Sequence, residues 1–167
     1  INYNASGALN MPLAVDTAAL RASAYYSREG GYIDNGALDD ENANASEVYG
    51  GRIELLFTPS ERLSVRAAGF LQNIRRDGEG TVDYAFDGEP LAGKLDQIRL
   101  FAEPYYQDFR LLSATVEYDL DWAELTSITS YQTTELGYVQ DLSPLYVPLF
   151  ASFGLPYGAI AADTDAE

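Results

Sequence analysis

Four stretches of the chain alternate apolar and polar residues with a period of two, which is the pattern of β-strands that have one apolar and one polar face. These stretches are residues 19–29, 49–57, 63–72 and 112–120. Residues 1–11 and 123–136 are also strand-like, but the first alternates weakly and the second offers two competing apolar sets. The sequence therefore predicts roughly six strands, four of them with an assigned apolar face.

The connections between these strands alternate in length. Short turns are expected at Pro12–Thr17, Thr58–Arg62 and Asp119–Trp122, and long loops near Asp34–Glu47, Asp77–Gln107 and Gly137–Glu167. Successive antiparallel strands place alternate connections at opposite ends of a sheet, so every short turn lies at one end. Outer-membrane barrels have this asymmetry. We predict an all-β protein, an antiparallel up-and-down meander that forms part of a transmembrane β-barrel.

The charged residues in the middle of the predicted strands all alternate with the apolar set, so they lie on the polar face. They are Arg21, Arg52, Glu54, Arg66 and Glu117. An arginine that faces lipid at mid-bilayer costs about 2–4 kcal/mol, whereas one that faces a watery lumen costs little. We therefore expect these charges to face the lumen, and of the two roles available there we favour cross-strand ion pairing that fixes the register over contact with a ligand or plug.

Aromatic residues gather near both ends of the predicted strands. Phe57, Tyr118 and Trp122 lie near the short turns, and Tyr32, Tyr49, Phe109, Tyr131 and Tyr138 lie at the long-loop ends. Two aromatic belts separated by small and aliphatic residues are typical of a membrane barrel. The alternative is that Tyr and Phe simply favour strands.

Composition narrows the possible functions. The formal net charge is −16, from 10 basic and 26 acidic residues, which argues against a nucleic-acid partner. The chain has no Cys and no His, so it offers no disulfide, no thiolate or imidazole metal site and no histidine base. No apolar run reaches the length of a membrane helix. We expect no enzymatic activity and no cofactor.

Short motifs occur in a familiar order along nearly the whole chain. They are Asn10-Met11-Pro12-Leu13, Leu20-Arg21-Ala22-Ser23, Gly31-Tyr32-Ile33-Asp34-Asn35, Gly51-Arg52-Ile53, Pro59-Ser60 and Leu125-Thr126-Ser127-Ile128-Thr129-Ser130-Tyr131. In this order they resemble the early barrel strands of a TonB-dependent outer-membrane receptor. The resemblance implies a barrel of about 22 strands that encloses an N-terminal plug. The chain would supply residues 1–167 as about a quarter of the wall, without the plug.

The same resemblance implies a function, a location and partners. Such a receptor lies in the bacterial outer membrane, among its lipids, and actively imports a large scarce nutrient such as a ferric siderophore, cobalamin or a glycan fragment. Uptake would be driven by the TonB energy-transducing complex through the missing N-terminal part. Two other functions remain open, a soluble acidic β-sandwich that binds ligands through its loops and a passive porin wall.

The second long loop holds the candidate ligand-binding residues. Arg75 and Arg76 lie at its entrance, Tyr84 and Phe86 in its middle, and Tyr105, Tyr106 and Gln107 at its exit. Arginine binds carboxylates or phosphates, and tyrosine stacks on aromatic or sugar rings. The acidic run 34–42 offers oxygen ligands but not the spacing of a calcium loop, so we expect it to be a solvated loop that holds no metal.

Overall fold

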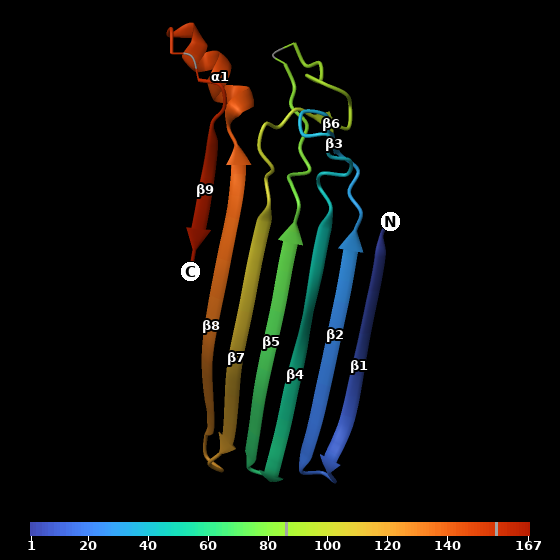
Figure 1. Cartoon of the computed structure of the whole chain (residues 1–167). Coiled ribbons are helices and arrows are strands. Elements are labelled where there is room, and N and C mark those ends of the chain that lie inside the picture. The colour runs from blue at the N-terminus through green and yellow to red at the C-terminus, as the bar shows by residue number, and fades with distance from the viewer. Residues whose placement is uncertain (86, 156) are drawn as a thin grey trace.

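The chain forms one antiparallel sheet of seven strands in a computed structural model that describes residues 1–85, 87–155 and 157–167. The strands are β1 (Tyr3–Ala14), β2 (Ala18–Glu29), β4 (Ser46–Ser60), β5 (Leu63–Arg76), β7 (Tyr105–Asp119), β8 (Glu124–Asp141) and β9 (Ala161–Ala166). They lie side by side in sequence order, which confirms the predicted meander (Figure 1). The sheet does not close on itself, so β1 and β9 are edges.

The ends of the sheet differ as the connection lengths predict. The short turns lie at one end and the long loops at the other (Figure 1). Asp16 and Asp121 adopt positive φ angles of 54° and 68° in two of the turns, a conformation that Asp tolerates better than most residues. Arg62 of the second turn forms a 2.6 Å ion pair with Asp121 of the third, so neighbouring turns are linked.

Regular structure extends into the part of the chain that was predicted to be a long loop after residue 137. Residues 161–166 pair with β8 as a seventh strand, and α1 (Ser143–Ser152) lies between β8 and β9. A two-stranded parallel sheet also joins the first two loops, through β3 (Asp34–Asn35) and β6 (Asp96–Gln97). The prediction of an irregular segment was wrong here, because β9 has the sequence Ala-Ala-Asp-Thr-Asp-Ala and carries little apolar signal.

The strand register defines two faces of the sheet. Leu20 lies opposite Leu55, Leu55 opposite Ala67, and Ala67 opposite Ala114, and these residues define what we call the apolar face. The adjacent row, with Arg21 opposite Glu54 and Glu54 opposite Ala68, belongs to the other side, the polar face. The register also shows which residues of β8 belong to the apolar face, a question that the sequence left open. Thr129 lies opposite Ala114, so Thr129 and the residues that alternate with it in steps of two are on the apolar face.

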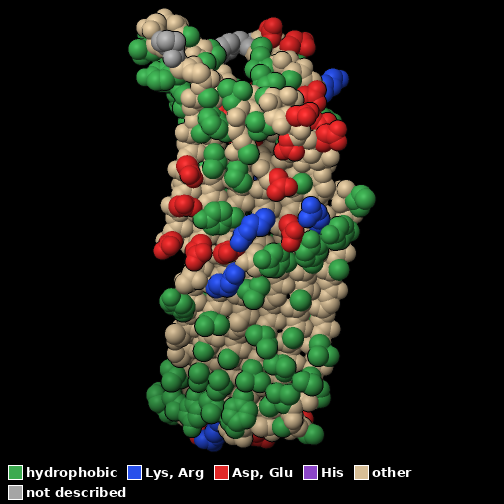
Figure 2. Space-filling view, viewed as in Figure 1, with side chains coloured by type: hydrophobic (Ala, Val, Ile, Leu, Met, Phe, Trp, Pro, Cys, Tyr) green, Lys and Arg blue, Asp and Glu red, His purple; other side chains and the backbone are tan. Residues whose placement is uncertain are grey.

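The apolar face carries no charge in the half of the sheet next to the short turns. We call this region the charge-free band, which consists of the apolar-face residues within 3–11, 20–26, 49–57, 63–71, 112–118 and 125–131. Figure 2 shows hydrophobic side chains gathered near the short turns, with charged ones mainly in the half nearer the loops and others at the outer edge formed by the turns themselves. Large side chains in the band remain accessible, including Ile53 and Leu112 at 53% and 63% exposure.

The fully buried apolar side chains of the described residues are few and lie away from the band. Ile33 and Ala43 are buried, and both belong to the first loop. The extensive contacts between strands are all between neighbours in the sheet, so within the described chain no second layer of strands covers either face. No helix in the described part is long and apolar enough to cross a membrane.

Candidate ligand-binding surface at the loop end

The two arginines and two tyrosines predicted to bind ligand meet in two pairs on opposite faces. Arg75 lies opposite Tyr106 and Arg76 opposite Tyr105, because these residues face one another across β5 and β7. The guanidinium carbon is 5.4 Å from the ring centroid in the first pair and 4.5 Å in the second. Consecutive residues of a strand point to opposite sides, so a single ligand on one side can contact only one pair.

The pair on the apolar face is held by other parts of the sheet. Arg75 forms a 2.6 Å ion pair with Asp108 and also donates to the carbonyl oxygen of Ile74. The Tyr106 hydroxyl donates to Asp165 of β9 at 2.6 Å. Both side chains therefore tie strands together, which is a structural role.

The pair on the polar face is less constrained. The Tyr105 hydroxyl donates to Gln107 at 3.1 Å, and Arg76 is exposed. Among the described residues Arg76 forms no ion pair, so its donors are available to a ligand on this side.

The five charges predicted to share a face do so. Glu54 forms a 2.7 Å ion pair with Arg52 within β4 and a 3.3 Å ion pair with Arg66 across to β5, and Arg21 donates to Asn10 at 3.1 Å. Glu117 lies opposite Ser64 on the same polar face. Because these groups are partly exposed, each pair stabilises the fold by at most about 1 kcal/mol.

The aromatic residues divide between the faces. Phe57, Tyr118, Tyr49 and Tyr131 lie on the apolar face near the two limits of the charge-free band. Phe109 and Tyr138 lie on the polar face, so the prediction that they belong to an outer belt was wrong. Phe109 instead packs near Phe70, with ring centroids 5.9 Å apart.

A buried polar cluster joins the second loop to the end of β8. The Arg99 guanidinium donates to Glu103, Asp83 and Thr81 at 3.0–3.2 Å. The Glu103 carboxylate also accepts from the amide of Asp141 at 2.8 Å. We call Arg99, Glu103 and Asp141 the loop lock, since all three are buried and connect segments distant in sequence.

The carboxyl groups of the loop lock have shifted pKa values. Burial raises the pKa of Glu103 above its ordinary value, although the amide of Asp141 and Arg99 favour the charged form. Burial also acts to raise the pKa of Asp141, but hydrogen bonds from Ser143 and from the amides of Leu100 and Phe101 outweigh it and lower the pKa. Sequence reasoning missed the loop lock because no local pattern marks its three residues.

A cavity of about 500 Å³ opens beside the loop lock. Tyr84, the predicted mid-loop ligand contact, lines this cavity, whereas Phe86 lies outside the described residues. The cavity wall also contains Glu79, Asp83, Tyr138 and Leu145. A concave surface with a few polar groups among apolar ones is the kind of site in which proteins bind small ligands.

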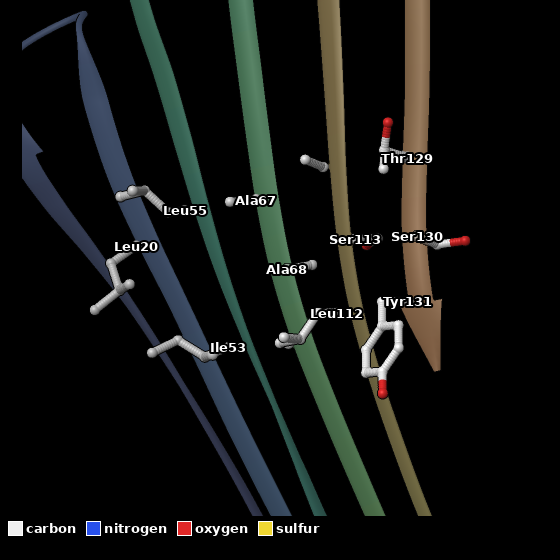
Figure 3. A pocket seen from close by; sticks show the side chains of 12 residues that line it. Leu20, Ile53, Leu55, Ala67, Ala68, Leu112, Ser113, Thr129, Ser130 and Tyr131 are labelled. Carbon is white, nitrogen blue, oxygen red and sulfur yellow. The ribbon is translucent and has the colours of Figure 1, made fainter. Parts of the chain in front are cut away.

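A second depression, of about 560 Å³, lies on the apolar face (Figure 3). The small residues Ala67 and Gly69 line it together with larger side chains such as Leu20, Ile53 and Leu112. Its polar groups on this face are the hydroxyls of Thr129 and Tyr131, and the rest of the lining from this face is apolar, so it suits a hydrocarbon chain better than a polar ligand.

The polar side chains of the acidic loops make hydrogen bonds within and between the loops. Among the described residues no three carboxylates are placed to hold a metal ion. In the run 34–42, the Asp34 carboxylate accepts from the amide of Asn42 at 2.8 Å, and the buried Asn35 side chain donates to the carbonyl of Arg99. These groups shape the loops.

Comparison with protein-family models, with curated proteins and with solved structures found no match. The faces of the sheet and the surface at the loop end are therefore the features that indicate a function.

Proposed function

We propose that this chain is part of the barrel wall of a TonB-dependent receptor in the bacterial outer membrane, which actively imports a large scarce nutrient such as a ferric siderophore. The observation that carries the proposal is the charge-free band on an apolar face that no described residue covers. Hydrocarbon chains of lipid would cover this face, and the polar face would point into the barrel.

The dimensions of the band support this proposal. On β5 the charge-free band runs from Leu63 to Leu71, a stretch of nine residues. A barrel's outward apolar band is about 25 Å tall, and a tilted strand crosses it in about 9–11 residues. The strands continue beyond the band on the loop side, where Arg75 and Asp108 form their ion pair on the same face.

The open edges of the sheet also support it. The outer sides of β1 and β9 lack a strand partner among the described residues, and such edges are prone to pair with other strands. In the proposed receptor these edges pair with the other strands of the barrel. The polar face and the loops then bind the nutrient, and no residue of the chain performs covalent chemistry.

The two alternative functions, a soluble sandwich and a passive porin, differ in what would cover the apolar face. A soluble sandwich needs a second layer of protein over it. A passive porin would share the lipid contact, but it would need neither a plug nor an energy source. A plug domain in the full-length protein and uptake that depends on an energy source would therefore separate a receptor from a porin.

The experiment uses the full-length protein that contains this chain. Heat-modifiable migration and a requirement for detergent would support a barrel. Uptake of a radiolabelled nutrient that stops in cells lacking the TonB complex would support active transport. A monomer that stays in solution without detergent would overturn the membrane location, and uptake unaffected by loss of the TonB complex would favour the porin.

A further inference from the structure

The cavity beside the loop lock has two walls of different chemistry. The second loop contributes the carboxylates of Glu79 and Asp83. The segment that follows β8 contributes Leu142, Pro144 and Leu145. Residues 142–160 contain no charged side chain at all, and Leu145 is 65% exposed. The rings of Tyr84 and Tyr138 also line the cavity.

The guanidinium group of Arg99, which lines this cavity, is already hydrogen-bonded to other groups of the protein. Arg99 is buried and donates to Asp83, Thr81 and Glu103, so its guanidinium presents little capacity to an anion. Burial of an anionic ligand against Asp83 and Glu103 would bring like charges together, which is unfavourable.

One carboxylate in the wall is not used by the fold. Within the described residues the Glu79 side chain forms no ion pair and no hydrogen bond, although it lies near enough to Glu103 to contribute to the raised pKa of that group. A carboxylate in this position can accept hydrogen bonds from a ligand cation, and such charge-assisted bonds are stronger than neutral ones.

The surrounding loops carry the same sign of charge. Their acidic residues are Asp34, Asp39, Asp40, Glu41, Asp77, Glu79, Asp83, Asp87, Glu89, Asp96 and Glu103, against Lys94 and Arg99. A surface with one dominant sign raises the local concentration of ligands of the opposite sign.

We propose that this cavity binds an organic cation, with its ammonium group at Glu79 and an adjoining apolar segment against Pro144 and Leu145. The inference deepens the proposed function, on which it rests, by assigning a charge to the imported compound. A ferric complex with a free amine on an aliphatic arm has this chemistry, and an anionic ferric complex does not.

The test is a binding titration of the full-length protein in detergent with two ferric probes. One is a linear trihydroxamate complex with a free terminal ammonium group, and the other is the same complex with the amine acetylated. We expect the ammonium form to bind about tenfold more tightly, as expected for one partly buried charge-assisted contact. Equal affinities, tighter binding of an anionic ferric catecholate, or no binding of the ammonium form at millimolar concentration would overturn the proposal.

Two matched variants locate the effect. Glu79→Gln removes the carboxylate charge in the cavity, and Glu89→Gln removes the same charge from the same loop outside the cavity. Glu79→Gln should lower the affinity for the ammonium form towards that of the acetylated form, and Glu89→Gln should leave it within about twofold. Equal effects of the two variants would show that general attraction, not the cavity, sets the preference.

Failure of this inference is distinguishable from failure of the proposed function. TonB-dependent uptake without a preference for the ammonium probe would overturn the cation site and leave the receptor. A protein that is soluble without detergent would overturn the receptor itself.

Discussion

Arg76 lies over the ring of Tyr105 on the polar face, with 4.5 Å between the guanidinium carbon and the ring centroid. Its neighbour Arg75 lies over Tyr106 on the apolar face and is held by Asp108. Two similar pairs, one residue apart, therefore face different surroundings, and only the pair that includes Arg76 faces the interior of the proposed barrel.

Substitution of the two arginines should separate these roles. Arg76→Gln should weaken nutrient binding several-fold, since a hydrogen-bond donor and a cation–π contact are removed from the polar face. Arg75→Gln should leave affinity unchanged and lower the free energy of unfolding by at most about 1 kcal/mol, because its ion pair is partly exposed. Binding titrations and urea unfolding in detergent measure both effects, and a larger loss of affinity in Arg75→Gln would contradict the assignment of faces.

Ala67 and Ala68 provide a matched test of which face contacts lipid. Ala67 lies in the middle of the charge-free band and Ala68 lies opposite Glu54 on the polar face. Ala67→Arg should destabilise the protein in a bilayer by about 2–4 kcal/mol, whereas Ala68→Arg should cost little.

Unfolding of both variants in lipid vesicles measures this difference. Similar costs for the two variants, or a larger cost for Ala68→Arg, would show that lipid does not cover the apolar face.

Gly50 is required by a close approach of neighbouring groups. A Cβ atom at this position would lie 2.5 Å from the carbonyl oxygen of Leu71 and 2.6 Å from the Tyr25 hydroxyl oxygen. Because Leu71 contributes a backbone atom, the neighbour cannot rotate away, and we expect Gly50→Ala to cost about 1–3 kcal/mol. Gly7→Ala is the control, since a Cβ atom added at Gly7 would meet nothing within 4 Å, and the unfolding midpoint of this variant should not fall.

The sheet could be predicted from the sequence to a larger extent than the loops could. Alternation placed Ile53 and Leu55 on one side and Arg52 and Glu54 on the other, because burial and strand geometry leave a local record in the sequence. The loop lock leaves none, since Arg99 and Asp141 are distant in sequence and each is ordinary in its own segment. The division of the arginine and tyrosine candidates between two faces was missed for another reason. These residues were treated as the entrance and exit of a loop, whereas β5 extends to Arg76 and β7 begins at Tyr105, so alternation along the strands places the two pairs on opposite sides.

The loop lock should respond to pH through Glu103. Its pKa is raised in the folded state, so the folded protein binds the proton more tightly than the unfolded chain. Local stability should therefore rise as the pH falls from neutrality through the folded pKa towards the ordinary value of 4.5. Asp141 acts oppositely, because its pKa is lowered, and its contribution should be lost only as the pH falls below its ordinary value of 3.8.

This pH dependence can be measured by hydrogen exchange of the amides of Leu100, Phe101 and Asp141. The exchange rates are corrected for the intrinsic rate at each pH. Protection should increase between neutrality and about pH 4.5 in the natural sequence and should stay level over the same range in Glu103→Gln. A decrease over this range in the natural sequence would contradict the raised pKa.

Because each strand of the main sheet pairs with the strands next to it in sequence order, folding can proceed by adding one strand at a time to a growing edge. A hairpin such as β1–β2 needs only a few turn residues to close. Closing the longer loop from β5 to β7 costs only a little more conformational entropy, because each doubling of a loop's length costs only about 0.6 kcal/mol. Such local pairing favours rapid hairpin formation. The sheet is thus suited to stepwise growth from either terminus, with each completed hairpin serving as the template for the next.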